Sequence, residues 1–302
     1  MCDEITEKEN QALFNRQAQT NQDATRSSGI TRRQFGGLAA SASLMMALPP
    51  VANALTISES DVTVTTPDGD ADCYFVHPAE GKHPAVLVWP DIIGLRPAFR
   101  EMGKRLAQSG YAVLVVNPFY RVKKAPVVAA GASFSDPDTR TTLIGLARQL
   151  TPETHVTDAK AFIDFLDAQA AVDTSRGVGT TGYCMGGPIV FRTAASMAHR
   201  VSAAATFHGG GLVTDAENSP HRLIPDMKAD FLIAVADNDD EREPHVKGVL
   251  KEDFAKANLE AEIEVYEGAM HGWCPPDSRV YHQEQAEKAW ARLLALFEKA
   301  LA

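Results

Sequence analysis

The first part of the folded chain shows a short-period hydrophobic pattern. Residues 62–65 alternate between valine and threonine, and residues 73–76 form a second short β-type stretch. The turn sequence Pro-Asp-Gly at residues 67–69 lies between them. Stretches of this kind joined by such a turn are typical of an antiparallel hairpin. We therefore expect a hairpin within residues 56–77.

The pattern changes after the hairpin. Residues 85–89 and 112–116 are continuously apolar, and residues 97–109 between them have helical spacing. Continuous apolar strands that alternate with amphipathic helices are typical of a mostly parallel sheet with helices on both faces. The alternation continues to the C-terminus, so we expect one α/β domain over residues 55–302. Further strands are predicted at 177–182, 203–207, 231–236 and 262–266, and further helices at 152–168, after Gly186, at 246–257 and at 279–301.

Residues 121–135 interrupt this alternation with an irregular segment rich in Ala, Val, Gly and Pro. In open α/β folds, ligands bind outside the carboxyl ends of the strands. We expect the segment to form a loop over that end of the sheet. The next predicted helix begins at Pro152 behind Thr151, because a capping threonine followed by proline favours a helix start.

The first 54 residues differ from the rest, and we expect them to form a disordered extension. Arg32 and Arg33 precede a small, apolar run at residues 36–48, which is too short to span a membrane. Small residues at 52–54 offer a cleavage site. This arrangement resembles a twin-arginine signal, which predicts export by that machinery to the periplasm or a similar location and a mature chain from Leu55 without a stable membrane span. The alternatives are a tail with a chance arginine pair and an uncleaved membrane anchor.

Composition narrows the function classes. The chain has 302 residues, of which 45% are hydrophobic and 23% charged, as is ordinary for a globular protein with one large core. The net charge of -10 comes without a cluster of Lys and Arg, and phosphate binding requires such a cluster, so no nucleic-acid surface is expected. No Cys or His pair has zinc-site spacing, and we expect neither a metal nor a cofactor.

Three cysteines remain if Cys2 is removed with the signal. An exported protein can keep disulfides, but an odd number of thiols leaves at least one free. Cys274 follows His271 by three residues and could oxidise with Cys184, which geometry must decide. We interpret Cys73, on the predicted hairpin, as a small buried hydrophobe.

The strongest functional motif is Gly-Tyr-Cys-Met-Gly-Gly at residues 182–187, directly after a predicted strand and before a predicted helix. This is the arrangement of a nucleophile elbow, in which the nucleophile sits on a tight, strained turn and glycines leave room for neighbouring elements. Cys184 occupies the nucleophile position, and the positive potential of the following helix N-terminus favours its thiolate. The alternative is a buried structural cysteine beside a glycine-rich turn.

An acidic run follows the strand predicted at residues 231–236. An acid at the end of a strand, after the nucleophile and before the histidine in sequence, fits the order of this fold. We favour Asp239 as that acid over its neighbours Asp237 and Asp240. The alternative is that these aspartates cap the next helix or lie in water.

A single histidine lies between the last predicted strand and the last predicted helix. It is His271, in a loop that can reach back over the sheet to the elbow. The three elements come in the expected order, which is more specific than any one of them. We therefore expect the sulfur of Cys184 to meet the imidazole of His271.

At these residues the chain resembles the dienelactone hydrolase family of α/β-hydrolases, and the likeness extends from about Ala71 to the C-terminus. In that family the elbow carries a cysteine with two glycines after it, as at residues 184–187, and the histidine lies in a turn like residues 267–271. The resemblance implies an α/β-hydrolase fold and a carboxylic ester hydrolase that acts on a small ester or lactone.

The resemblance also implies residues around the nucleophile. Residues 88–95 look like the family's segment after an early core strand, where a glutamate commonly holds the resting thiol, and the shorter Asp91 stands in that place. Arg121 looks like one of the family's arginines that anchor a substrate carboxylate, but residues 274–276 lack the second one, so specificity for a dienelactone is not predicted. Aromatic candidates for the pocket wall, or for plain core, are Trp89, Phe119, Tyr120, Phe134 and Trp273.

Together these residues predict covalent catalysis. Cys184 attacks an ester, lactone or thioester carbonyl, His271 protonates the leaving group and then activates water, and Asp239 orients His271. The backbone N–H groups of Met185 and Ile92 are predicted to bind the oxyanion. Two other classes stay open: a non-catalytic binding protein on the same fold and a thiol-redox protein, which is less favoured because no CxxC pair is present.

Overall fold

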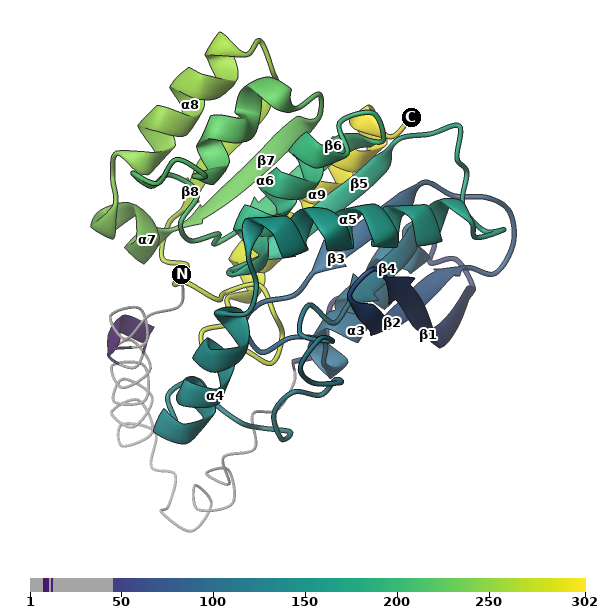
Figure 1. The fold of residues 1–302 in the computed structure, drawn as a ribbon, viewed down its shortest axis with the longest axis horizontal. Coiled ribbons are helices and arrows are strands. Elements are labelled where there is room, and N and C mark those ends of the chain that lie inside the picture. The colour runs from purple at the N-terminus through teal and green to yellow at the C-terminus, as the bar shows by residue number, and fades with distance from the viewer. Residues whose placement is uncertain (1–7, 11, 13–45) are drawn as a thin grey trace, which may run out of the picture.

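One eight-stranded sheet organises the part of the chain that the computed structural model describes, residues 8–10, 12 and 46–302 (Figure 1). The strand order is β1-β2-β4-β3-β5-β6-β7-β8. β2 pairs antiparallel with β1 and with β4, and every other neighbouring pair is parallel. The strands are β1 (Ile57–Thr66), β2 (Gly69–Pro78), β3 (Ala85–Trp89), β4 (Ala112–Val116), β5 (Val178–Tyr183), β6 (Val201–Phe207), β7 (Asp230–Ala236) and β8 (Ala261–Tyr266).

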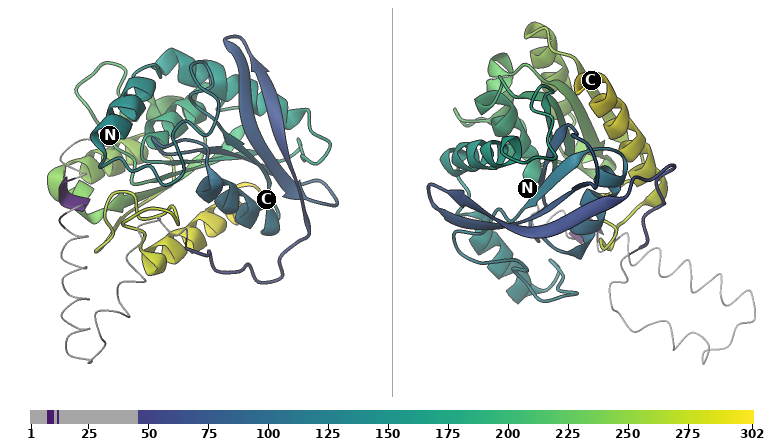
Figure 2. Two further views of the ribbon diagram at one scale, coloured as in Figure 1. Left: turned by 90° about the horizontal axis from the view of Figure 1, so that it is seen from below. Right: turned by 90° about the vertical axis from the view of Figure 1, so that its right-hand side faces the viewer.

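Helices cover both faces of this sheet, as predicted (Figures 1 and 2). Successive side chains of a strand point to opposite faces. In β3, Leu87 and Trp89 join the hydrophobic cluster of one face, while Val86 and Val88 join that of the other. The first face packs against α5 (Pro152–Asp167), α6 (Gly186–Ser196) and α8 (Val246–Lys256), and the second against α3 (Pro97–Gln108) and α9 (Gln283–Ala300). Burial on both sides explains why the central strands are continuously apolar.

Three short helical segments were not predicted. They are α4 (Pro137–Ala147), α7 (Asp237–Arg242) and the 3₁₀ helix Pro220–Asp226. At the start of α4, the Thr139 N–H donates to the Asp136 carboxylate at 2.8 Å, a capping pattern that the sequence offers at Asp136-Pro137. The apolar periodicity of these segments is too weak to reveal a helix by itself.

The last helix begins four residues later than the predicted start at 279. The ring nitrogen Nδ1 of His282 accepts a hydrogen bond from the Gln285 N–H and caps α9. Residues 279–282 therefore stay in the preceding loop, and Arg279 reaches the pocket described below.

The parallel strands all end at one edge of the sheet, and the loops at this edge carry the polar residues singled out in the sequence. Asp91 follows β3, Cys184 follows β5, Asp239 lies just after β7 and His271 follows β8. The irregular segment 121–135 lies over this edge, with Phe134 in a small hydrophobic cluster beside it.

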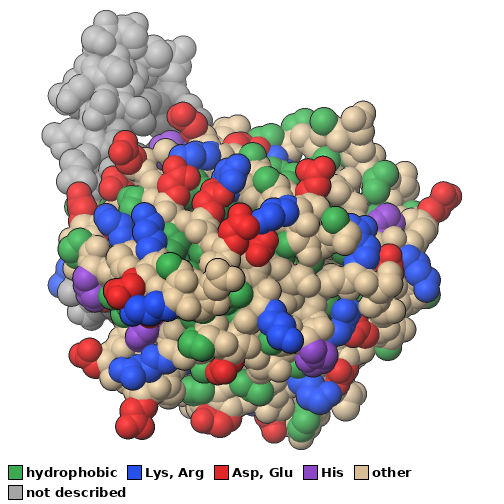
Figure 3. Space-filling model, turned by 90° about the horizontal axis from the view of Figure 1, so that it is seen from above, with side chains coloured by type: hydrophobic (Ala, Val, Ile, Leu, Met, Phe, Trp, Pro, Cys, Tyr) green, Lys and Arg blue, Asp and Glu red, His purple; other side chains and the backbone are tan. Residues whose placement is uncertain are grey.

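The predicted export signal lies largely outside the described residues, and the arginine pair lies wholly outside them. Residues 46–54 are described and have no regular secondary structure. The Met46 N–H donates to the Pro276 carbonyl, and Leu48 packs against the cluster beneath α9, so this stretch is attached to the domain. None of the described helices is long and apolar enough to span a membrane. On the face shown in Figure 3, acidic and basic side chains are interspersed.

Candidate active site

Cys184 occupies a strained turn between β5 and α6. Its φ of 52° lies in the left-handed region, which non-glycine residues seldom adopt. The Cys184 N–H donates to the Phe207 carbonyl at 3.0 Å, and the Gly187 N–H donates to the Cys184 carbonyl at 3.0 Å. A Cβ atom on Gly182 would lie 2.4 Å from the Gly186 carbonyl oxygen, and one on Gly186 would lie 2.5 Å from the Trp89 carbonyl oxygen. The glycines are therefore required by close backbone contacts across the elbow.

The acid and the histidine meet through the loops after β7 and β8. His271 Nδ1–H donates to Asp239 Oδ2 at 2.7 Å, and the His271 backbone N–H donates to the Asn238 side-chain oxygen at 2.8 Å. Asp237 instead accepts from the Gly268 N–H, and Asp240 pairs with Lys247. Asp239 is thus the aspartate of this run that contacts the histidine.

The charge states of this pair follow from its surroundings. Burial of the His271 ring opposes protonation, but Asp239 and the Cys184 sulfur beside the ring raise the pKa of His271 to about 10. Burial disfavours an ionised Asp239, but the positive His271 ring lowers the pKa of that carboxyl below its usual value. The site therefore holds a cationic imidazole between a carboxylate and a sulfur at neutral pH.

The backbone N–H groups of Ile92 and Met185 were predicted to bind the oxyanion. Ile92 follows Asp91 in the loop after β3 and lines the same pocket as Cys184. Met185 follows Cys184 and caps α6. Neither the Ile92 nor the Met185 N–H donates to a loop carbonyl within the described part of the chain.

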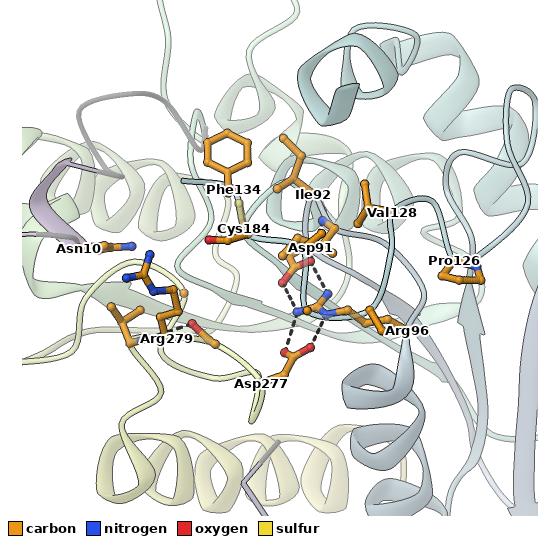
Figure 4. A pocket seen from close by; sticks show the side chains of 18 of the residues that line it. Asn10, Asp91, Ile92, Arg96, Pro126, Val128, Phe134, Cys184, Asp277 and Arg279 are labelled. Atoms are coloured by element: carbon orange, nitrogen blue, oxygen red, sulfur yellow. Dashed lines mark hydrogen bonds and ion pairs between the residues drawn. The ribbon is translucent and has the colours of Figure 1, made fainter. Parts of the chain in front are cut away.

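These groups open into a pocket of about 410 Å³ (Figure 4). Cys184, His271 and Phe134 line it, and Figure 4 shows Cys184 and Phe134 among its labelled residues. The predicted loop supplies one side, with Pro126 and residues 128–134. Residues 277–280, before α9, supply another. The lining is mostly apolar with few charged groups, as in typical small-molecule sites.

Asp91 lines the pocket but is bound to arginine. Arg96 donates through Nη1 to Asp91 Oδ1 at 2.6 Å and through Nη2 to Asp91 Oδ2 at 2.9 Å. Arg96 also holds Asp277, through Nε at 2.7 Å and Nη2 at 2.9 Å (Figure 4). Burial raises the pKa of Asp91, and Arg96 opposes that rise. Asp91 therefore faces the same pocket as Cys184 and acts electrostatically on its sulfur while both of its oxygens accept from Arg96.

Three residues expected to bind substrate lie elsewhere. Arg121 forms ion pairs with Asp158 at 2.6 Å and Asp68 at 2.6 Å, and it does not line the pocket. The Tyr120 hydroxyl donates to Asp158 at 2.8 Å, so Tyr120 belongs to the same structural network. Trp273 is fully buried and stacks on Tyr266 beneath the site. The expectation for these three residues is corrected: they hold the framework of the site instead of its surface.

Other residues of the pocket were missed in the sequence. Arg96, Asp277 and Arg279 line it, although their positions in loops carry no motif. His208 also lines it, and its place directly after β6 is a signal that could have identified it.

An N-terminal residue reaches the site as well. The Asn10 side-chain amide donates to the His271 carbonyl at 2.9 Å, and Asn10 lines the pocket. Glu9 accepts from Asn238 at 2.7 Å and from Arg242 at 3.0 Å. These contacts lie on the loops that carry the histidine and the acid.

The cysteines of the described chain are unbridged. Cys73 is a buried core residue, as interpreted from the sequence. Cys274 is buried in the cluster beneath α9 and does not line the pocket, so the structure does not support its oxidation with Cys184. Among the described residues, no group of His, Cys, Asp and Glu is arranged to hold a metal ion.

The chain is similar to known proteins over most of its length. The model of the dienelactone hydrolase family matches residues 71–301, more than half of the chain. A protein of Salmonella typhi with a provisional carboxymethylenebutenolidase name is 27% identical over 252 residues, which cover 80% of this chain and 87% of that protein. A carboxymethylenebutenolidase of Rhodococcus opacus is 24% identical over 224 residues, which cover 73% of this chain and 83% of that protein.

Solved structures share the fold. A crystal structure from Klebsiella pneumoniae subsp. pneumoniae MGH 78578, described provisionally as a dienelactone hydrolase, superimposes with a TM-score of 0.69 at 23% identity and covers 81% of this chain and 99% of that one. The α/β-hydrolase fold predicted from the sequence is thereby confirmed.

The elbow predicts a sharp difference between two glycine substitutions. Gly186→Ala places a methyl group against the Trp89 carbonyl, and we expect it to lower the free energy of unfolding by about 1–3 kcal/mol. Gly248→Ala, on α8 with no atom within 4 Å of the added Cβ, is the matched control and should be neutral or stabilising by up to about 1 kcal/mol. Urea unfolding of both variants measures this, and equal stability would contradict the packing described.

The His271–Asp239 pair predicts a proton titration. Because Asp239 raises the pKa of His271 while burial lowers it, the ring should stay protonated through neutral pH and lose its proton near pH 10, and Asp239→Asn should move that midpoint downwards. Nitrogen NMR of the imidazole follows the titration. Asp237→Asn, whose side chain contacts Gly268, is the control and should leave the midpoint in place. Identical titrations in the wild type and Asp239→Asn would show that Asp239 does not set the charge of the ring.

Proposed function

Because this chain belongs to the dienelactone hydrolase family and is a hydrolase, we propose that it cleaves an ester, lactone or thioester of a small carbonyl substrate through a triad of Cys184, His271 and Asp239. The observation that carries the proposal is the 2.7 Å bond between His271 and Asp239, on a ring whose other side lies against the sulfur of a strained elbow. The three side chains come from separate segments at one edge of the sheet: the turn after β5, α7 and the loop after β8.

The reaction is an acyl transfer in two steps. The Cys184 thiolate attacks the substrate carbonyl carbon, and the N–H groups of Met185 and Ile92 stabilise the oxyanion that forms. The protonated His271 gives its proton to the leaving oxygen or sulfur as the acyl group stays on Cys184 as a thioester. His271, now neutral, takes a proton from water, and the resulting hydroxide releases the acid. Asp239 stabilises the imidazolium in both directions.

The pocket limits the substrate to a small molecule. A cavity of about 410 Å³ with a mostly apolar lining lies in the range of small-ligand sites. The similar proteins named carboxymethylenebutenolidases make a lactone a reasonable first substrate. Arg121 is ion-paired with Asp68 and Asp158, so we do not propose that it binds a substrate carboxylate.

We also propose that the protein is exported by the twin-arginine machinery and acts in the periplasm or a similar location. Arg32 and Arg33, the short apolar run at residues 36–48 and the small residues at 52–54 support this proposal. An export route would separate the enzyme from cytoplasmic reductants, and the buried positions of Cys73 and Cys274 keep those thiols from solvent.

The nucleophile is tested by substitution. We expect Cys184→Ala to lower kcat for hydrolysis of 4-nitrophenyl acetate by at least about 10³-fold, because the covalent route is removed. Cys184→Ser should also lose most of its activity, since a serine hydroxyl ionises far less easily than a thiol. Cys274→Ala removes a buried thiol outside the pocket and is the control that should stay active. Undiminished turnover by folded Cys184→Ala would refute the triad, and absence of turnover by the wild type with esters, lactones and thioesters would favour a binding protein.

The export proposal is tested in cells. We expect replacement of Arg32 and Arg33 by lysine to leave an unprocessed precursor in the cytoplasm, because the machinery reads the arginine pair. Arg26→Lys, which keeps the pair, is the control. Fractionation with an antibody against the protein measures the distribution, and unchanged export of the lysine variant would contradict the proposal.

A further inference from the structure

A second histidine, His208, faces the nucleophile. It follows β6 directly and lines the same pocket as Cys184 and His271. Its φ of 42° lies in the left-handed region, and its backbone N–H donates to the Ala234 carbonyl at 2.8 Å. Backbone strain at a non-glycine residue persists when the surrounding structure fixes it, and such residues concentrate at functional sites.

The ring of His208 is enclosed without an ordinary polar partner. The residue is 1% exposed, and its ring lies 5.1 Å between centroids from both His271 and Trp273. Neither ring nitrogen meets the geometric limits of a hydrogen bond to an oxygen, nitrogen or sulfur atom among the described residues. Buried polar groups are nearly always hydrogen-bonded. Cys184 lines the same pocket, and its sulfur acts electrostatically on the His208 ring.

The charge of His208 differs from that of His271. Burial lowers the pKa of His208, contact with Cys184 opposes this, and the positive His271 lowers it further. Asp239 also raises the pKa of His208, but the effect of burial is larger and the pKa stays below its usual value. The Tyr183 ring lies 6.2 Å from the His208 ring between centroids. His208 is therefore neutral where His271 is cationic, and a neutral imidazole keeps one N–H donor.

We propose that His208 donates this N–H to the sulfur of Cys184 and holds the thiolate in the resting enzyme. The inference rests on the proposed function in taking Cys184 as the nucleophile. A hydrogen bond to an ionised acceptor is stronger than one between neutral groups, so the bond favours the thiolate over the thiol. Asp91, which also acts electrostatically on Cys184, is an acceptor already ion-paired with Arg96, so the N–H donor to the sulfur is assigned to His208. Proton transfer remains with His271, since His208 stays neutral throughout.

Alkylation of the thiol tests the bond. The rate at which iodoacetamide modifies Cys184, measured by mass spectrometry of its peptide from pH 5 to 9, reports the thiolate fraction. In His208→Phe the midpoint should rise by about one pH unit, so that the rate at pH 6 falls roughly tenfold. The same variant should lose kcat with little change in KM. An unchanged midpoint in folded His208→Phe would overturn the proposal.

Two further variants separate this role from packing. His208→Asn keeps an N–H donor and tolerates the left-handed backbone, so its midpoint should lie nearer to that of the wild type. His155→Phe alters another buried histidine whose ring nitrogens lack partners, on α5 and outside the pocket, and should leave the midpoint unchanged. A His155→Phe shift as large as that of His208→Phe would show a general packing effect and would overturn the proposal.

A measurement on the wild type covers the case in which His208→Phe fails to fold. Nitrogen NMR should show the His208 ring neutral from pH 6 to 8, with an N–H signal that shifts when Cys184 is alkylated. A cationic ring, or a signal indifferent to alkylation, would overturn the proposal. The two proposals fail separately. If the wild type has no esterase activity but His208→Phe still raises the alkylation midpoint, the proposed reaction is wrong and the His208–Cys184 bond stands.

Discussion

The site depends on the left-handed turn at Cys184, because that turn presents the sulfur to the pocket at the end of a buried strand. All of β5 is buried between two layers of helices, and Cys184 directly follows its carboxyl end. The turn is compatible with its neighbours only because glycine stands at 182 and 186, where any Cβ would strike backbone atoms. Strain of this kind, of the order of 1–3 kcal/mol, is maintained by the surrounding packing. The chemistry is therefore built into the sheet edge before any ligand arrives.

Buried charges around the turn are paired so that each has a defined form. His271 is held cationic by Asp239, and Arg96 is shared by Asp91 and Asp277. A buried ion without a partner would be strongly destabilising, which explains why no carboxylate in this wall is left without a cation. The Arg96 network also joins the loop that carries Ile92 to the loop that leads from His271 towards α9. The loop that carries Ile92 and the loop that leads from His271 are thus fixed relative to one another by one guanidinium.

Local rules predicted much of this molecule from its sequence. The strands at residues 85–89 and 112–116 have the predicted bounds, because continuous apolar runs between helices leave little choice, and the elbow motif located Cys184 from its glycines alone. Asp239 and His271 were located by their order along the chain. What failed were inferences that need a tertiary partner. Arg121 stands at a position that resembles the family's motif, but its guanidinium is bound by Asp158, which is buried on α5. Asp91 shares the pocket with Cys184 as expected, but its ion pair with Arg96 has no signal in the sequence.

The central claim is that an acyl group is carried on the sulfur of Cys184. Mass spectrometry of the wild-type protein, quenched in acid during turnover of an activated ester, tests it most directly. The account predicts one added acyl group per chain, located on the peptide that contains Cys184 and released by hydroxylamine as a thioester is. Turnover without acylation of that peptide, or an acyl group found on a different residue, would contradict it.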